Sequence, residues 1–427
     1  MKSLPSTLIN NSFYTVLDQF LALSVGLIIT VTLARYFGPE DFGRFTYVIS
    51  LTGIVNVFTN LGIQTLLRRE IAKEDDGLRN YIGQAWVIRF IISLPISIIS
   101  VHLIGYLFDF SSNQLILAHL ANLFTFLSGI LALNVGAFLS LHLGKKLFLY
   151  NLLFRVSTIS ALFLVVFFSL NLEAYIGFIS LGLLFVVLAS CFNFFKLDKS
   201  INLIPDLNKL KYIIFSSLPL MFAAAIEFMN LKIDTLILAY YHGEEVLGYY
   251  SAAFNIFMAF VMIPLAITKV YFTNFIQTFY KGLKAEALRL LRIITFSFFI
   301  YSLICSIFLF FFSESLISLL FGNGYFNSNK ALSVLGWVLP FIILNRLFIY
   351  LIVALGKSKI LLIINSFGLG LNVTLNFILI PKYSLVGAAL ATGFSEGIVL
   401  FIGLWFLLKA LKQDPKKNNL FTDEEVY

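Results

Sequence analysis

The sequence predicts an all-α integral membrane protein with about twelve transmembrane helices. Of its 427 residues, 59% are apolar and only 12% are charged, whereas roughly a quarter of a soluble domain is charged. The mean hydropathy is +0.93. The apolar residues form runs of about 20 or more, which is the length that a helix needs to cross a bilayer. A helix also satisfies its own backbone hydrogen bonds, as a lipid environment requires.

Polar breaks divide the chain into twelve predicted spans. They lie near residues 10 to 36, 44 to 66, 81 to 107, 115 to 141, 147 to 169, 174 to 195, 212 to 241, 247 to 268, 287 to 312, 331 to 355, 360 to 380 and 384 to 409. The longest external link is expected at 313 to 330, and residues 412 to 427 are expected to form a polar cytoplasmic tail. The first run has no small-residue cleavage site, so we expect it to be a span and no signal peptide.

The basic residues predict the orientation of these spans. Of the 30 Lys and Arg residues, four lie inside spans and four on one side, at Arg35, Arg44, Lys330 and Lys382. The remaining 22 lie on the side of the two termini. Cytoplasmic links are enriched in Lys and Arg, so both termini are predicted to be cytoplasmic. The net charge of +8 therefore does not indicate nucleic-acid binding.

Two segments 205 positions apart predict an internal repeat. LARYFGPEDFGRF at 33 to 45 and LAYYHGEEVLGYY at 238 to 250 share Leu, Ala, Tyr, Gly, Glu and Gly in register. Each joins the first and second spans of a six-span half. Tight turns alone would explain the glycines, but not the shared Leu, Ala and Tyr.

A second pair of motifs extends the repeat. Leu143-Gly144-Lys145 and Leu355-Gly356-Lys357 lie between the fourth and fifth spans of each half. Because six is even, both halves enter the membrane in the same orientation, and a pseudo-two-fold axis along the membrane normal should relate them. We predict an N-terminal six-helix bundle at 1 to 200, a C-terminal six-helix bundle at 201 to 411, and the tail.

The opening pattern of the chain resembles that of a known family. Asn11, the segment 33 to 43, Leu61-Gly62 and the segment RREIA at 68 to 72 are similar to polysaccharide-export flippases of the O-antigen type. These belong to the multidrug and oligosaccharidyl-lipid exporter superfamily. The second half agrees through KIDT at 232 to 235 and Ala252-Ala253, so the resemblance covers nearly the whole chain.

The resemblance implies a fold and a function. It implies two six-helix bundles in a V around a central cavity, and alternating access that moves an undecaprenyl-pyrophosphate-linked oligosaccharide from the cytoplasmic to the outer leaflet of a bacterial inner membrane. Other polysaccharide assembly proteins would then be partners, together with membrane lipids. Two alternatives remain open: a multidrug cation exporter of the same superfamily, and a membrane enzyme that polymerises or ligates lipid-linked sugars.

Eight ionisable residues inside predicted spans are candidate functional residues. An Arg, Lys or Asp at a helix centre costs about 2.5 to 3.5 kcal/mol in insertion experiments, so these side chains should face a wet cavity or one another. Arginine and lysine suit phosphate oxygens, and a buried carboxylate can carry a coupling ion. Snorkelling and static ion pairs are the structural alternatives. The candidate anion contacts are Arg89, Arg155, Lys232 and Arg346, and the candidate ion-coupling residues are Asp18, Glu227, Asp234 and Glu396.

The sequence predicts neither an enzyme nor a cofactor site. Cys191 and Cys305 lie in apolar runs without metal-ligand spacing. The four histidines are scattered, and we find no nucleophile with a neighbouring base and no glycine-rich phosphate loop.

Overall fold

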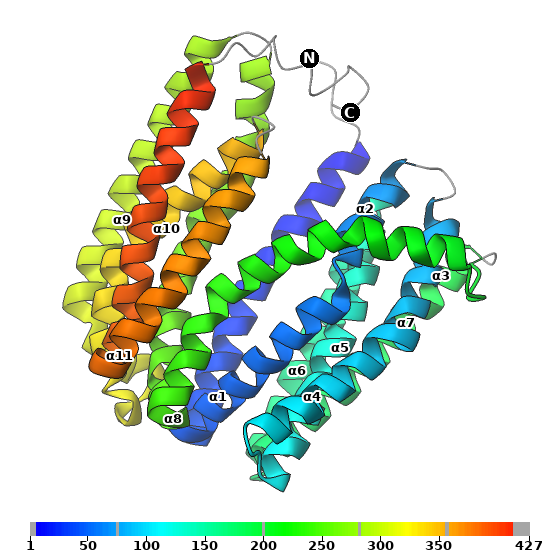
Figure 1. Ribbon diagram of the computed structural model, residues 1–427, viewed down its shortest axis with the longest axis horizontal. Helices are drawn as coiled ribbons and strands as arrows, with labels where there is room; N and C mark the ends of the chain where they lie inside the picture. The colour runs from blue at the N-terminus through cyan, green and yellow to red at the C-terminus, as the bar shows by residue number, and fades with distance from the viewer. Residues whose placement is uncertain (1–5, 74–76, 199–200, 281–282, 355–357, 413–427) are drawn as a thin grey trace. The chain divides into compact units, whose positions relative to one another are not determined.

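The computed structural model describes residues 6–73, 77–198, 201–280, 283–354 and 358–412 (Figure 1). The elements are α1 (Ser6–Asn60), α2 (Ile63–Lys73), α3 (Gly77–Ile88), the π-helical turn η1 (Arg89–Ser93), α4 (Leu94–Leu107), α5 (Ser112–Ser140), α6 (Gly144–Phe167), α7 (Leu172–Leu197), α8 (Leu207–Tyr280), α9 (Lys284–Phe321), the 3-10 turn η2 (Asn323–Tyr325), α10 (Ser328–Ala354) and α11 (Ser358–Lys412). Both the predicted tail beyond Lys412 and the motif Leu355-Gly356-Lys357 lie outside the described residues.

Twelve apolar segments can be counted in these described ranges. Nine helices are long and apolar enough to cross a membrane. Three of the nine, α1, α8 and α11, are interrupted by a non-helical residue at Gly38, Gly243 and Ser384 respectively. Each of these three therefore supplies two spans. The all-α membrane fold predicted from the sequence is confirmed.

The two repeat motifs adopt the same backbone conformation at their glycines. Gly38 has φ 77° and ψ 177°, and Gly243 has φ 81° and ψ 179°. Only glycine occupies this region without strain, which explains why glycine occurs at both positions. Pro39 then begins the second segment of α1, where its missing N–H costs no helical hydrogen bond.

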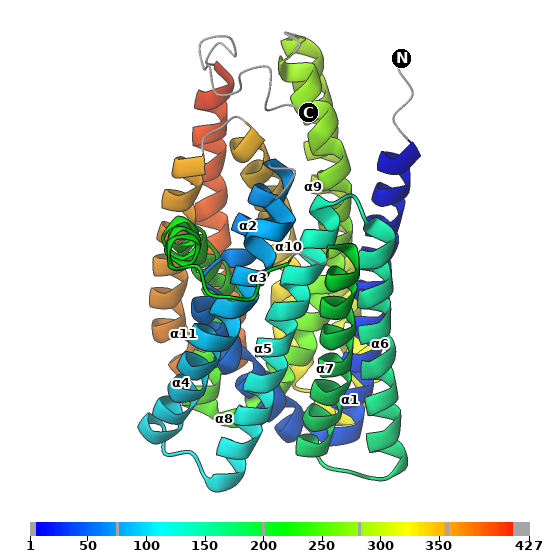
Figure 2. The same ribbon diagram turned by 90° about the vertical axis from the view of Figure 1, so that its right-hand side faces the viewer.

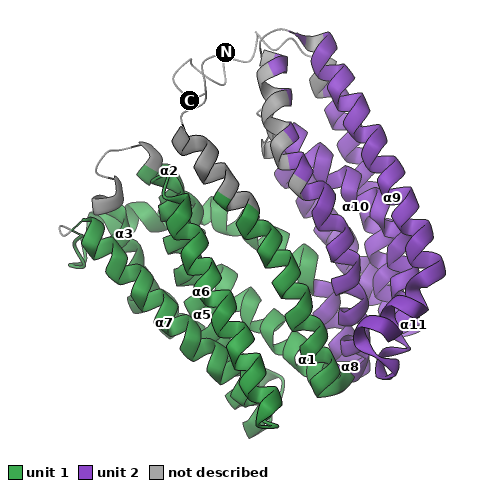
Figure 3. Ribbon diagram, turned by 180° about the vertical axis from the view of Figure 1, so that it is seen from behind, with its two compact units in different colours: residues 1–232 green, residues 233–427 purple. Residues whose placement is uncertain are grey.

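Figure 3 shows two compact units, residues 1–232 and 233–427. The division falls between Lys232 and Ile233, within α8, so the N-terminal part of α8 packs with unit 1. There the Tyr212 ring lies 6.2 Å from the Tyr81 ring, centroid to centroid. The assignment of the two bundles to 1 to 200 and 201 to 411 stays a prediction.

Unit 1 is organised around α5, which packs with α1, α2, α4, α6 and α7. Figure 2 shows α4 to α7 side by side. Phe138 of α5 stacks on Phe194 of α7 with ring centroids 4.2 Å apart. Beside them, Asn134 accepts a hydrogen bond from Trp86 Nε1 at 2.9 Å and donates one to Ser190 Oγ at 2.8 Å. A buried amide satisfied in this way fixes the register of the helices.

Unit 2 is held by α10 packing on both α9 and α11. Ser306 of α9 donates a hydrogen bond to the Gly336 carbonyl at 2.7 Å. Within α11, Asn372 Nδ2 donates to Ser395 Oγ at 3.1 Å, across the break at Ser384. Interhelical hydrogen bonds of this kind are how polar side chains contribute to packing in membranes.

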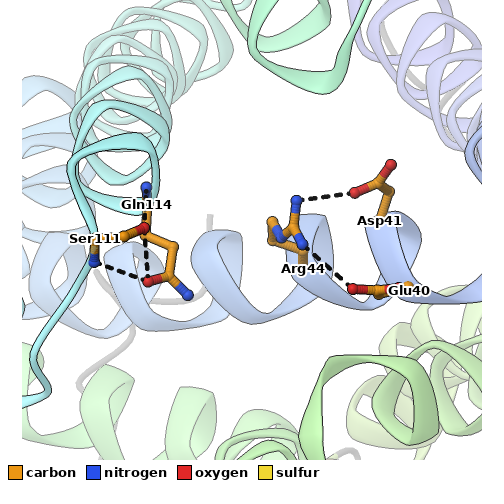
Figure 4. Close-up of polar contacts among 5 residues, drawn as sticks. All are labelled: Glu40, Asp41, Arg44, Ser111 and Gln114. Atoms are coloured by element: carbon orange, nitrogen blue, oxygen red, sulfur yellow. Dashed lines mark hydrogen bonds and ion pairs between the residues drawn. The ribbon is translucent and has the colours of Figure 1, made fainter.

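Two helix starts carry polar caps (Figure 4). In α1, the segment that begins after Gly38 carries Glu40 and Asp41 in its first turn, and Arg44 lies 3.0 Å from Asp41 and 3.5 Å from Glu40. Acidic groups at a helix start interact favourably with the helix dipole. At the start of α5, Ser111 and Gln114 form a capping box that satisfies two backbone N–H groups.

Three local features differ from the sequence prediction. The sequence predicts a second span that reaches residue 66, but α1 ends at Asn60 because Leu61 and Gly62 have positive φ. A Cβ on Gly62 would lie 2.6 Å from the Met221 backbone nitrogen, so glycine permits this close approach. The predicted link at 313 to 330 is largely helical, since α9 continues to Phe321 with Ile317 and Phe321 buried. The third span contains the π-helical turn η1.

Candidate functional site

A row of polar side chains in unit 1 faces α5. We call it the polar seam, and it consists of Asn56, Asn60, Gln64 and Arg68, each four positions after the last. Asn56 Nδ2 donates to the Thr125 carbonyl at 2.5 Å, and Gln64 Nε2 donates to the Ala132 carbonyl at 3.0 Å.

Further contacts between the polar seam and α5 involve Ser140 and two glycines of α5. The Arg68 carbonyl accepts a hydrogen bond from Ser140 Oγ at 3.1 Å. Gly129 and Gly136 of α5 leave room for the seam, because a Cβ would lie 2.6 Å from Asn60 Oδ1 at the first position and 2.8 Å from Arg68 Nε at the second.

Arg89 of η1 reaches the same face of α5. Its side chain is nearly inaccessible, with the residue 1% exposed. Nη2 donates to the Phe126 carbonyl at 2.7 Å, and the guanidinium carbon lies 4.7 Å from the centre of the Phe126 ring. A Cβ on Gly129 would lie 2.4 Å from Arg89 Nη2, so the guanidinium occupies the space that this glycine leaves.

The guanidinium of Arg89 is only partly satisfied. Its Nε and Nη1 are buried and have no hydrogen-bond partner. No carboxylate among the residues that the structure describes forms an ion pair with it. A buried charge without a partner costs several kcal/mol, and π-helical turns are frequent at functional sites. The Arg89 guanidinium therefore keeps two buried nitrogens that no described side chain satisfies.

Arg155 and Asp18, by contrast, are paired. Arg155 Nη1 of α6 and Asp18 Oδ1 of α1 lie 2.7 Å apart, and their side chains are 13% and 14% exposed. The other carboxylate oxygen of Asp18 accepts a hydrogen bond from Asn151 Nδ2 at 3.0 Å. The structure thus brings together one candidate anion contact and one candidate coupling residue.

The candidates in unit 2 lie in two places. Asn345 of α10 donates to Glu396 Oε2 of α11 at 2.5 Å and to the Glu396 carbonyl at 2.8 Å. Arg346, the next residue, is half-buried. Asp234 of α8 is 4% exposed and accepts a hydrogen bond from the hydroxyl of Tyr250 at 2.5 Å.

The last two candidates lie in the part of α8 that belongs to unit 1. Lys232 is half-buried and Glu227 is exposed. Glu227 and Asp234 are seven positions apart on α8, yet only Asp234 is buried. The roles of all eight residues in binding or ion coupling stay predictions.

The fold also reveals two features that sequence reasoning missed. The four-residue spacing of the polar seam is readable in the sequence, but the sequence does not show that these side chains meet α5. His102 of α4 and His119 of α5 have ring centroids 4.5 Å apart, although seventeen positions separate them. No group of three or more His, Cys, Asp or Glu side chains in the described ranges can hold a metal ion.

At the edge of unit 1, α2 carries an ion pair outside the apolar spans. Arg69 Nε donates to Glu70 Oε1 at 2.8 Å. This hydrogen bond raises the pKa of the Arg69 guanidinium. Because Ile63, Leu66, Leu67 and Ile71 of the same helix are buried, α2 is an amphipathic helix with a charged outer face.

Comparison with known proteins identifies the family to which this chain is similar. The family model described as "Polysaccharide biosynthesis protein" matches residues 8–279, and the MatE model matches residues 219–378. The capsular polysaccharide biosynthesis protein CapF of Staphylococcus aureus is 26% identical over 414 residues, which covers 93% of this chain and 99% of CapF.

Solved structures show the same fold. An inward-facing multidrug resistance MATE family transporter has a TM-score of 0.73 at 15% identity, covering 93% of this chain and 96% of that one. The lipid II flippase MurJ in an inward closed conformation has a TM-score of 0.71 at 16% identity, covering 96% and 88%. At 15% and 16% identity these two structures show the fold of the chain. The chain belongs to the polysaccharide biosynthesis protein family, and its fold is that of the MATE and MurJ structures.

Proposed function

We propose that the protein flips a lipid-linked oligosaccharide, carried on undecaprenyl pyrophosphate, from the cytoplasmic to the outer leaflet of a bacterial inner membrane. The observation that carries this proposal is the buried guanidinium of Arg89 with two unpartnered nitrogens. A pyrophosphate supplies the anionic oxygens that such a group binds best. The kinship with CapF, a protein named for capsular polysaccharide biosynthesis, supports a sugar polymer as the destination of the cargo.

The polar seam gives the sugar part of this cargo a second set of contacts. It runs beside Arg89 along α5, and its amides have both donors and acceptors for hydroxyl groups. Asn56 Oδ1 is buried and without a hydrogen-bond partner. A headgroup at Arg89 would therefore find amide partners on the neighbouring turns of α1.

Ion coupling is assigned in this proposal to Glu396. The contact that the structure gives its carboxylate is with a neutral amide, that of Asn345. Among the described residues, this carboxylate therefore has no ion pair to break, unlike that of Asp18. Glu396→Gln should abolish the dependence of transport on an imposed ion gradient, while Glu314→Gln, at an exposed position of α9 that is not a candidate, serves as the control. Equal gradient dependence in both variants would contradict the assignment.

The proposed function is tested by removing the protein from its host and locating the lipid-linked sugar. We expect the sugar lipid to accumulate in the cytoplasmic leaflet and to reach the outer leaflet again when the gene is restored. Arg89→Gln should fail to restore export at matched protein levels, whereas Arg89→Lys, which keeps the charge but loses the planar donors, should restore it partly. Unchanged export in the deletion strain would refute the proposal.

A multidrug cation exporter is the competing function, supported by the MatE model match at residues 219–378. Such a cargo favours carboxylates and would be repelled by Arg89. Resistance to cationic dyes that depends on the protein and survives Arg89→Gln would favour this alternative. We also propose that both termini are cytoplasmic. A reporter enzyme that is active only outside the cytoplasm should therefore be inactive when it is fused to the C-terminus.

A further inference from the structure

The helices α4 and α5 form an antiparallel hairpin within unit 1 (Figure 2). Two contacts fix how the helices are aligned. Near the turn of the hairpin, a Cβ on Gly105 would lie 2.9 Å from Leu115 Cδ1. Farther from the turn, Asn122 Nδ2 donates a hydrogen bond to Ser97 Oγ at 3.2 Å. The residues of both helices that lie between these two contacts are therefore held at the same level.

A pair of histidines occupies the level between these contacts. His102 of α4 and His119 of α5 have ring centroids 4.5 Å apart and ring planes at 48°. His102 is exposed and His119 is half-buried. Among the described residues, His119 Nε2 has no hydrogen-bond partner although it is buried, and the same holds for Oδ1 of Asn122, which lies one turn farther along α5. Buried polar atoms without a partner are unfavourable, so a bound group that satisfies them is favoured.

Both histidines lie near one end of the membrane-crossing hairpin. His102 is five residues before the end of α4, and His119 is seven residues after the start of α5. At 1.5 Å per residue, each is roughly 8 to 11 Å from that end. The 29 residues of α5 span about 43 Å, which matches a bilayer with its headgroups, about 40 to 45 Å. The rings are therefore expected where the headgroups meet the hydrocarbon core, within reach of ions from solution.

Two imidazoles at this distance have the ligand chemistry of a transition-metal ion. Imidazole nitrogen binds zinc, copper and nickel, whereas calcium and magnesium prefer oxygen ligands. A zinc ion about 2 Å from one nitrogen of each ring would hold the two ring centres about 5 Å apart, close to the spacing in the hairpin. The buried nitrogen of His119 is a ligand of the required kind. The free amide oxygen of Asn122 can accept a hydrogen bond from a water molecule on the ion.

We propose that His102 and His119 bind a divalent transition-metal ion such as zinc, and that this ion links α4 to α5. Seventeen positions separate the two histidines, so no ligand spacing in the sequence predicts the site. Two protein ligands are fewer than the four of a structural zinc site. Water should therefore complete the coordination, and the ion should exchange with solution. The proposal does not depend on the proposed function, because neither histidine belongs to the polar seam or contacts Arg89.

The test is a calorimetric titration of zinc into the purified full-length protein in detergent, prepared with an affinity tag that contains no histidine. The wild type should bind one zinc ion per chain, and calcium should not compete. His102→Gln and His119→Gln each remove one ligand and should weaken zinc binding at least tenfold, because the loss of an outer-shell partner alone costs about 10- to 100-fold.

His142→Asn is the matched control. It removes a histidine at an exposed position with φ 57°, a backbone conformation that asparagine tolerates, and it should bind zinc as the wild type does. Equal zinc affinity in the wild type and in both ligand variants would overturn the proposal. A wild type that binds no zinc would overturn it as well.

Two further measurements keep the test independent of how well the variants fold. One equivalent of Cu²⁺ bound to the wild type should give an electron paramagnetic resonance spectrum with coupling to two imidazole nitrogens, and a spectrum without nitrogen coupling would contradict the site. Zinc should also raise the melting temperature of the wild type, because the ion binds the folded hairpin and not the unfolded chain. A chelator should reverse this rise, and an unchanged melting temperature would count against the link between α4 and α5.

Discussion

The ion pair between Asp18 and Arg155 gives a quantitative test of which intramembrane charges are structural. The two charged atoms are 2.7 Å apart. With an effective dielectric constant of about 20, their attraction is about 6 kcal/mol. Desolvation of both groups offsets most of it, but removal of one partner leaves the other charge buried and costs about 3 kcal/mol. We therefore expect Asp18→Asn and Arg155→Met each to lower the free energy of unfolding by about that amount.

The double variant separates pairing from independent effects. Since neither charge remains unpaired, it should be no less stable than either single variant, giving a coupling energy of about 2 to 3 kcal/mol. The assay is reversible unfolding by sodium dodecyl sulfate in mixed micelles, followed by circular dichroism. Glu40→Gln is the control, because its ion pair with Arg44 is exposed and should contribute under about 1 kcal/mol.

Two outcomes would refute this reasoning. Additive effects of the single variants would mean that the residues do not stabilise each other. A double variant with restored stability but no transport would show that Asp18 or Arg155 acts on the cargo or the coupling ion, and that pairing is secondary. Retained transport in the double variant supports a structural pair.

Three further substitutions test other contacts. Gly129→Ala places a Cβ 2.4 Å from the buried guanidinium of Arg89, so it should lower the free energy of unfolding by about 1 to 3 kcal/mol and impair export. Gly177→Ala is the control: its Cβ would have nothing within 4 Å, so it should change neither stability nor export. Tyr250→Phe removes the hydrogen bond to the buried carboxylate of Asp234 and should lower the free energy of unfolding by about 1 to 3 kcal/mol; no change in chemical unfolding would contradict this. Gly243→Ala forces an alanine to adopt φ 81°, so it should lower the free energy of unfolding by about 1 to 3 kcal/mol. A melting temperature equal to that of the wild type would contradict this prediction.

The spans were predictable because the bilayer constrains sequence so strongly. Twelve apolar stretches require about twelve crossings, whatever the packing between them. The glycine motifs were predictable for a similar reason, since Gly38 and Gly243 each occupy a backbone region that excludes other residues. Where a helix ends depends instead on its neighbours. The break at Leu61 and Gly62 relies on the close approach of the Met221 backbone, which no local pattern encodes.

The partners of the charged residues could be predicted only in part. The sequence shows that a buried charge needs a partner, but not which one, and Asp18 meets Arg155 across more than a hundred residues. Arg89 was found as a candidate because it is an arginine within a span. Its lack of a carboxylate neighbour became visible only from the fold. The polar seam was missed because the sequence does not show that residues on either side of the break at Leu61 and Gly62 face the same helix.

The π-helical turn at Arg89–Ser93 allows the length of this span to vary by one residue. Its Leu94 N–H bonds to the Arg89 carbonyl five residues earlier, so the turn contains one residue more than an α-helical turn would. Deleting Phe90 should convert the turn to α-helix and leave the rest of the span in phase. A deletion in an ordinary helix such as α5 would rotate all later side chains by about 100°. Relatives one residue shorter at this point would thus keep the bundle, with a continuous α-helix in place of the turn.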